Sequence, residues 1–135
     1  MNSFPHFIIV DDDYTNNFLC TKIIQLVLNE VKIHTFLTPE EGLQFFESSQ
    51  QITEISSGVL FLDINMPTMS GWEFLEHFEK LDENVKHKIK VFILSSSVDS
   101  RDKRKAFTYG SVSDYIIKPL TKNKIQAIYT ELSAA

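Results

Sequence analysis

The hydrophobic residues of this chain fall into two kinds of segment that alternate along the sequence. Short apolar runs rich in β-branched and aromatic residues occur at Phe7–Val10, Val31–Phe36, Val59–Leu62, Val91–Leu94 and Tyr115–Ile117. Runs of this length and composition are typical of strands that are buried on both faces. The segment Val31–Phe36 also contains polar residues, but it fits the same series. The pattern therefore predicts five strands.

Longer segments with apolar residues at helical spacing separate these strands. The first predicted helix runs from about Thr15 to Asn29, with an apolar stripe of Leu19, Ile23, Leu26 and Val27. The second begins at Thr38–Glu41, which offers an N-cap, a proline at the first helical position and two acids in the first turn. The other three are expected after Ser70–Gly71, from about Ser100 to Tyr109 with Gly110 as C-cap, and from Thr121 onward, with Ile125, Ile128, Tyr129 and Leu132 on one face.

Strand and helix thus alternate five times within 135 residues. Such alternation predicts an α/β fold in which a parallel sheet carries helices on both faces, joined by right-handed crossovers. No Pro/Gly-rich linker divides the chain, so residues 1–135 are expected to form a single domain with five helices. The least regular stretch, Gln50–Gly58, is predicted to be a surface loop.

The charge balance argues against nucleic acid as a partner. The formal net charge is -5 and the sequence pI is about 5.3, so the chain lacks the basic footprint that binding to phosphate backbones requires. One basic cluster stands out, formed by Arg101, Lys103, Arg104 and Lys105. It is interpreted as the solvated face of a helix, and a docking surface for an acidic partner is the alternative.

Other features point to the cytoplasm. The N-terminus has no basic region followed by an apolar region, and no apolar run is long enough to cross a bilayer. The single cysteine, Cys20, has no partner for an intramolecular disulfide and lies in an apolar helical pattern, which suits a reducing compartment. The four histidines share no metal-ligand spacing and are interpreted as structural or surface residues.

Polar side chains follow four of the predicted strands at the point where each strand ends. They are Asp11, Asp12 and Asp13 after the first strand, Asp63 after the third, Ser95 after the fourth, and Lys118 after the fifth. The carboxyl ends of parallel strands meet at one edge of a sheet, where α/β proteins bind their ligands. We therefore expect these side chains to share one site.

The chemistry of these groups favours a magnesium-assisted phosphoryl transfer. Carboxylates from two strands repel one another unless a cation intervenes, and Mg²⁺ prefers oxygen ligands. Asp12, Asp63 and a backbone carbonyl in the next turn could supply part of its shell. Lys118 adds a positive charge and Ser95 a hydroxyl donor, so a carboxylate could accept a phosphoryl group here.

Longer motifs around these residues carry a family resemblance. The segments are Ile8–Asp12, Leu62–Pro67 with Ser70–Gly71, Ile93–Ser96, and Asp114–Pro119. With these motifs the chain resembles the CheY-like receiver domains of two-component response regulators over about residues 7 to 132. The resemblance implies a flavodoxin-like, doubly wound five-stranded sheet with strand order 2-1-3-4-5, an order for which a family member is a known example.

The resemblance also implies roles for individual residues. Asp63 would be the phosphoacceptor, and Asp12, Asp63 and the carbonyl of Asn65 would bind Mg²⁺ directly, with Asp11 helping through water. Asp13 would belong to the helix entry. Ser95 and Lys118 would contact the phosphoryl group, and the bond from Lys118 to Pro119 would be cis. Ser95 and Tyr115 would form a switch that changes conformation on phosphorylation.

The implied partners are a histidine kinase or a histidine phosphotransfer protein upstream and an unidentified protein downstream, with neither nucleic acid nor a membrane involved. The chain would be a stand-alone receiver without an output domain, and a switch with at most slow self-dephosphorylation instead of an enzyme.

Three alternatives compete. A haloacid-dehalogenase-type phosphohydrolase needs an acid where Asn65 stands. A flavodoxin-like FMN carrier needs a phosphate loop where Asp11–Asp13 stand. A degenerate receiver, which is never phosphorylated, would lack some of the key site residues, whereas this chain has a suitable residue at every key position.

Overall fold

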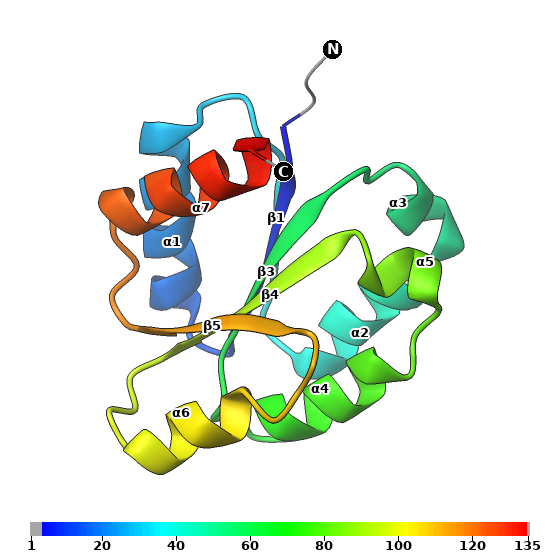
Figure 1. Ribbon diagram of the computed structural model, residues 1–135, viewed down its shortest axis with the longest axis vertical. Coiled ribbons are helices and arrows are strands. Elements are labelled where there is room, and N and C mark those ends of the chain that lie inside the picture. Colours follow the sequence, from blue (N-terminus) through cyan, green and yellow to red (C-terminus); the bar gives the residue numbers. More distant parts are fainter. Residues whose placement is uncertain (1–3, 135) are drawn as a thin grey trace.

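The computed structural model describes residues 4–134, which form a five-stranded parallel sheet. The strands are β1 (His6–Val10), β2 (Ile33–Phe36), β3 (Gly58–Leu62), β4 (Ile89–Ser95) and β5 (Val112–Ile117). Their order is β2-β1-β3-β4-β5, and every neighbouring pair is parallel (Figure 1). The predicted α/β fold and strand order are confirmed.

Residues 4–134 contain seven helices, so the prediction of five was wrong. They are α1 (Tyr14–Val27), α2 (Pro39–Glu47), α3 (Ser49–Thr53), α4 (Gly71–Glu79), α5 (Glu83–Lys86), α6 (Ser100–Ala106) and α7 (Lys122–Ala134). The two extra helices, α3 and α5, are single short turns. Each begins at a capping side chain, Ser48 for α3 and Asp82 for α5, which accepts a hydrogen bond from a free backbone N–H. Such short helices lack the periodicity that would reveal them in a sequence.

The segment Gln50–Gly58 is therefore not the surface loop that was predicted. Its first part is helical, and both Ile52 and Ile55 are buried, with 6% and 2% of their surface exposed. The predicted C-cap at Gly110 is also wrong, because α6 ends at Ala106 and no described glycine has a positive φ. The N-cap at Thr38 and the helix start at Thr121 are confirmed, since both side chains accept backbone hydrogen bonds.

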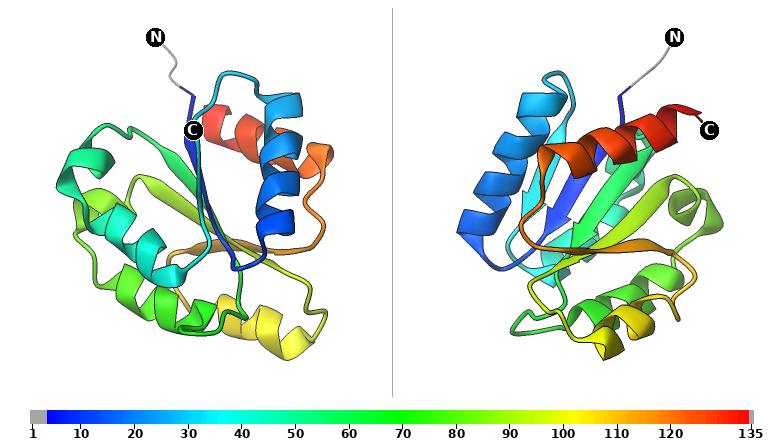
Figure 2. Two further views of the ribbon diagram at one scale, coloured as in Figure 1. Left: turned by 180° about the vertical axis from the view of Figure 1, so that it is seen from behind. Right: turned by 60° about the vertical axis from the view of Figure 1, so that its left-hand side comes forward.

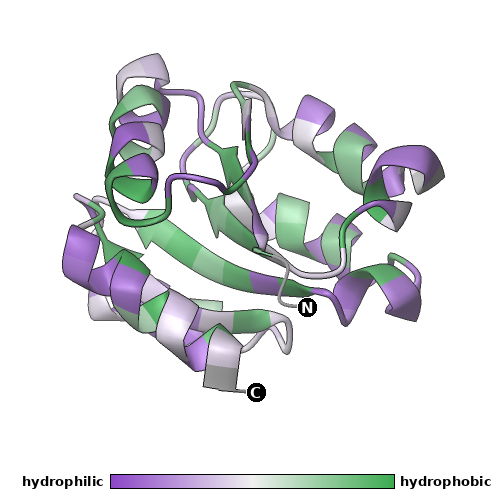
Figure 3. Cartoon of the chain, turned by 90° about the horizontal axis from the view of Figure 1, so that it is seen from above, coloured by the Kyte–Doolittle hydropathy of each residue, from purple (hydrophilic) through white to green (hydrophobic). Residues whose placement is uncertain are grey.

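Helices cover both faces of the sheet, as expected. Helices α1 and α7 lie on one face, and α2, α4 and α6 lie on the other (Figures 1 and 2). Figure 3 shows strands that are largely hydrophobic between helices of mixed character. Each face therefore encloses its own apolar core, which explains why the strands read as continuous hydrophobic runs. No helix among residues 4–134 has the length and apolar character needed to span a bilayer.

Helix α1 is rotated relative to the predicted stripe. Leu19 and Leu26 are 55% and 71% exposed, whereas its buried residues are Asn17, Cys20 and Ile24. Two contacts accompany this orientation: the Asp13 side chain caps the helix, and the Asn17 amide donates to the backbone carbonyl of Asp11. Because a polar residue lies on the buried face, apolar periodicity alone selected the wrong face for part of this helix.

Candidate functional site: an acidic cluster at the carboxyl end of the sheet

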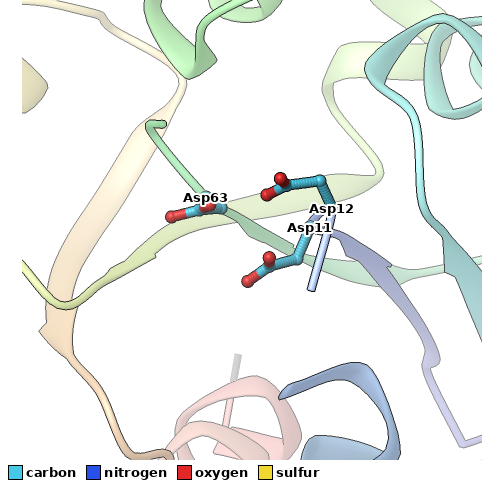
Figure 4. Close-up of side chains that lie close together, drawn as sticks. All are labelled: Asp11, Asp12 and Asp63. Carbon is cyan, nitrogen blue, oxygen red and sulfur yellow. The ribbon is translucent and has the colours of Figure 1, made fainter. Parts of the chain in front are cut away.

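Sheet pairing continues one residue beyond the strands and brings two acids to the same edge. The backbone N–H of Asp63 donates to the carbonyl of Val10 at 3.0 Å, and that of Asp11 donates to Phe36 at 3.1 Å. Carboxylate oxygens of Asp11, Asp12 and Asp63 lie within 4.8 Å of one another. Figure 4 shows the three side chains gathered between the ends of β1 and β3. The sequence prediction that these acids meet is confirmed.

The three acids differ in exposure. Asp11 and Asp63 are 2% and 8% exposed, whereas Asp12 lies open to solvent. Burial, and next the negative charge of Asp11, raise the pKa of Asp63 to about 6, although Lys118 and a backbone hydrogen bond from Ile64 pull it down. Asp63 therefore carries an unfavourable negative charge at neutral pH, which a nearby cation would relieve.

Lys118 neutralises Asp11 more directly than Asp63. Its Nζ lies 2.8 Å from Asp11 Oδ2 and 3.7 Å from Asp63 Oδ1. Burial lowers the pKa of Lys118, but the hydrogen bond and charge of Asp11, together with Asp63, raise it overall. One ammonium thus faces two buried carboxylates, with the exposed carboxylate of Asp12 beside them. The cluster keeps an excess of negative charge even with its lysine in place.

The backbone of Lys118 is hydrogen-bonded to the end of the neighbouring strand. The Lys118–Pro119 peptide is cis, as the resemblance implied, and the Lys118 N–H donates to the Ser95 carbonyl at 2.9 Å. This bond ties the end of β5 to the end of β4. As a result, the lysine and the predicted hydroxyl residue Ser95 emerge at the same edge as the acids.

Ser97, in the loop after β4, is hydrogen-bonded to both residues predicted to form a switch. Ser95 is fully buried, and its hydroxyl accepts a hydrogen bond from the Ser97 N–H at 3.1 Å. Tyr115 is 8% exposed, and its hydroxyl donates to the Ser97 carbonyl at 3.0 Å. The Ser97 hydroxyl in turn donates to Asp102 at 2.6 Å. Tyr115 therefore points inward and is linked to Ser95 through the backbone of Ser97.

Sequence reasoning missed two residues that hold Asp11. Asn16 Nδ2 donates to Asp11 Oδ2 at 2.8 Å, and Asn17 Nδ2 donates to the Asp11 carbonyl at 3.0 Å. Both lie in the first turn after the Asp13 cap, so the side chains of that turn face back toward the end of β1. The predicted helix-entry role of Asp13 is confirmed, because its carboxylate accepts from the N–H groups of Thr15 and Asn16.

A glycine lets the loop after Asp63 pass close to helix α4. The Gly71 N–H donates to the Ile64 carbonyl at 2.7 Å, and a Cβ at Gly71 would lie 2.5 Å from the Asp63 carbonyl oxygen. Any larger residue would collide with the backbone that carries Asp63. A capping box formed by Ser70 and Glu73 starts the helix at this point. Asn65 lies exposed in the same loop.

The donor set fits a hard divalent cation. Three carboxylates within 4.8 Å of one another supply oxygen ligands, and the exposed Asp12 leaves the cluster open to a hydrated ion. Mg²⁺ prefers such oxygen ligands and retains part of its water shell. The unbalanced charge described above gives the cation a direct stabilising role. The cluster is therefore a candidate magnesium site.

Comparison with known proteins places this chain in one family. A family model described as the response regulator receiver domain matches residues 7–130. The chemotaxis protein CheY of Treponema pallidum is 28% identical over 126 residues, covering 92% of this chain and 80% of that protein. The cyclic di-GMP phosphodiesterase response regulator RpfG of Xanthomonas campestris is 26% identical over 122 residues, and the chain spans only 30% of its length.

Solved structures agree with the family match. A two-component response regulator from Cytophaga hutchinsonii is 30% identical with a TM-score of 0.87, covering 99% of this chain and 100% of that one. A response regulator receiver protein from Dyadobacter fermentans is 28% identical with a TM-score of 0.85, covering 95% of this chain and 97% of that one. The chain belongs to the response regulator receiver domain family.

Proposed function

We propose that this chain is a stand-alone receiver that accepts a phosphoryl group from a phosphohistidine onto Asp63. The observation that carries the proposal is the placement of the buried Asp63 carboxylate beside Lys118 and two further carboxylates. The match to Treponema CheY, most of whose length the chain covers, supports action through the receiver's own surface. The partners would be a histidine kinase or histidine phosphotransfer protein and a downstream protein, meeting in the cytoplasm.

In the proposed transfer, an Asp63 carboxylate oxygen forms a bond to phosphorus while the bond between phosphorus and the donor imidazole nitrogen breaks. The electron pair of that bond leaves with the imidazole. Lys118 would stabilise the negative charge on the phosphoryl oxygens, and the Ser95 hydroxyl would donate to one of them. Asp11 would keep the lysine at this edge through the 2.8 Å ion pair.

Magnesium would be held by Asp12, Asp63 and the Asn65 carbonyl, with Asp11 contributing through water. When bound, Mg²⁺ offsets the charge of the carboxylates and of the incoming phosphoryl oxygens. The protein's own contribution is to hold the acids within reach of one ion while keeping Asp63 shielded from bulk water.

The proposed output step starts at Ser95. A phosphoryl oxygen that draws the Ser95 hydroxyl away from the Ser97 N–H would alter the loop that also binds the Tyr115 hydroxyl. Phosphorylation would thereby shift the balance between conformations of Tyr115 and the surface around β5.

Acetyl phosphate with Mg²⁺ tests the acceptor directly. One phosphoryl group per chain is expected by intact mass, and Asp63→Asn should abolish the labelling. Asp13→Asn is the matched control, since an asparagine still caps α1 and Asp13 lies outside the three-acid cluster. Unchanged labelling in the Asp63→Asn variant would overturn the assignment. Multiple-turnover hydrolysis of phosphate esters would instead favour a phosphohydrolase.

A further inference from the structure

The carboxylate of Asp11 is hydrogen-bonded through both of its oxygens. Its Oδ1 accepts from the Asp13 backbone N–H at 2.9 Å, and its Oδ2 accepts from Asn16 Nδ2 at 2.8 Å. The Nζ of Lys118 lies at the same distance, 2.8 Å, from this Oδ2. An uncharged amide and a charged ammonium therefore share one oxygen of a residue that is 2% exposed.

Asn16 is held in the orientation that this contact needs. Its backbone N–H donates to Asp13 Oδ1 at 3.3 Å, which fixes the residue in the first turn of α1. An ionised carboxylate only accepts hydrogen bonds, so the Asn16 amide must present its nitrogen to Asp11. Both the backbone and the side chain of Asn16 are thus anchored to acids, and its donor faces Asp11 while Lys118 is still bound there.

The other contacts of Asp11 do not duplicate that of Asn16. The Asp13 N–H donates to the opposite carboxylate oxygen, and the Asn17 amide donates to the Asp11 backbone carbonyl at 3.0 Å. Among residues 4–134, Asn16 and Lys118 supply the side-chain donors of the Asp11 carboxylate. Asn16 is consequently the donor that stays at Oδ2 when Lys118 moves.

Lys118 lies closer to the acid that does not receive the phosphoryl group. Its Nζ is 2.8 Å from Asp11 Oδ2 and 3.7 Å from Asp63 Oδ1. A phosphoryl group on Asp63 would bring further anionic oxygens next to this ammonium and draw it away from Asp11. A buried carboxylate oxygen that loses every donor is strongly destabilising. The Asn16 amide prevents this loss at Oδ2.

We propose that Asn16 is a positioning residue for phosphoryl transfer, which allows Lys118 to pass from Asp11 to the phosphoryl group on Asp63. The inference rests on the proposed function. Before transfer, the Asn16 amide shares Oδ2 with the ammonium, so Asp11 attracts the lysine less strongly. After the lysine has moved, the amide remains as the donor to that oxygen. Both effects favour the state in which Lys118 contacts the phosphoryl group.

The first experiment measures the rate of labelling by acetyl phosphate in Asn16→Leu, which has a side chain of similar size without a donor. The rate at saturating acetyl phosphate and Mg²⁺ should fall about tenfold, because the lysine moves during transfer. Asn16→Asp keeps the shape but replaces the donor by an acceptor, and it should be at least as slow. Wild-type rates in both variants would overturn the assignment.

The control for this experiment is Thr21→Val. It removes a 2.8 Å hydrogen bond to the Asn17 carbonyl within the same helix, does not involve Asp11, and should label at the wild-type rate. The shift in thermal midpoint with MgCl₂ should be retained in Asn16→Leu, because the three acids are unchanged. Loss of that shift would mean that Asn16 only maintains the structure of the cluster, and it would overturn the positioning role.

The second experiment observes the lysine itself by NMR, in the chain without Mg²⁺ or phosphodonor. The coupling across the hydrogen bond between Lys118 ¹⁵Nζ and Asp11 ¹³Cγ reports how closely the two groups pair. It should increase in Asn16→Leu, because Asp11 then has no competing side-chain donor, and it should stay unchanged in Thr21→Val. An unchanged or smaller coupling in Asn16→Leu would contradict the sharing of Oδ2.

These outcomes separate the two proposals. Failure of acetyl phosphate to label the wild-type chain would overturn the proposed function and, with it, the role of Asn16. Normal labelling of the wild-type chain, together with unchanged rate and coupling in Asn16→Leu, would overturn only the role of Asn16. Slower labelling with a retained Mg²⁺ response and a larger Lys118–Asp11 coupling supports both.

Discussion

Ionisable side chains lie close together at both ends of strand β1, but the two ends differ in how the electrostatic interaction between these groups is balanced. At the amino end, His6 Nδ1 and His34 Nε2 lie 3.1 Å apart and the rings are almost parallel. One neutral ring can donate its N–H to the other, so this pair is satisfied without any outside group. At the carboxyl end, Asp11 and Asp63 share a single lysine and stay crowded with like charge.

The difference shows which end of the sheet is built for a ligand. Histidines can share a proton between them, and burial lowers the pKa of both His6 and His34, which keeps them neutral. Ionised carboxylates have no such internal solution, so their repulsion persists until a cation or a proton arrives. A local conflict that the fold leaves unresolved is typical of a functional site.

The largest expected effect comes from adding a side chain at Gly71, which lies against the backbone of Asp63 and Ile64. Gly71→Ala would place a methyl group 2.5 Å from the Asp63 carbonyl oxygen and 2.8 Å from Ile64 Cα. We expect a loss of more than about 3 kcal/mol in unfolding free energy, together with loss of acetyl phosphate labelling. Gly110→Ala is the control, because only Glu79 Oε1 approaches that position, at 3.9 Å. Similar urea midpoints for the two variants would contradict the close approach.

The second prediction concerns the charge on Asp63. Its pKa rises from 3.8 to about 6 on folding, so ionisation opposes folding. Without metal, stability should fall as the pH rises from about 4 to about 6, by about 3 kcal/mol in total. Asp63→Asn should therefore be more stable than wild type at pH 7 and lose this advantage at pH 3.5. The measurement is the unfolding free energy of both proteins from urea unfolding at each pH. The same difference between the two proteins at pH 3.5 and pH 7 would refute the prediction.

The third prediction adds the cation that the acidic end is expected to need. At tenfold excess over its dissociation constant, Mg²⁺ should stabilise the folded chain by about 1.4 kcal/mol. Asp12→Asn should weaken this effect because Asp12 belongs to the three-acid cluster, whereas Asp13→Asn should retain it. The measurement is the shift in thermal midpoint with MgCl₂ concentration at constant ionic strength. An identical Mg²⁺ response in both variants would remove Asp12 from the site.

The smallest effect is expected at the histidine end, with the opposite sign. Since the pKa values of His6 and His34 are lowered in the folded chain, protons bind the unfolded chain more readily. The stabilising contribution of the neutral histidine pair should thus be lost as the pH falls below 6.5. Over the same range, protonation of Asp63 should make the folded chain more stable. His34→Gln should reduce that loss, and ¹H–¹³C NMR titration of the His6 ring provides the direct readout. A His6 pKa above 6.5 would contradict the neutral pair.

The sequence alone determined the alternation of strands and helices, the family motifs, and the set Asp11, Asp12, Asp63, Ser95 and Lys118 at strand ends. These signals are local, because buried parallel strands are continuous apolar runs and the polar residues follow them directly. The same reasoning failed for α3 and α5, which are too short to show periodicity, and for the buried face of α1. There a polar residue, Asn17, takes an inward position through a bond to Asp11.

Only the tertiary structure decided how the site is balanced. It showed that Lys118 pairs more closely with Asp11 than with Asp63, that Asn16 and Asn17 hold Asp11, and that Tyr115 points inward onto Ser97. These relations depend on distances between side chains from different elements, and on burial that sets the charge of each group. A linear pattern specifies which residues reach the edge of the sheet, whereas packing specifies which of them touch.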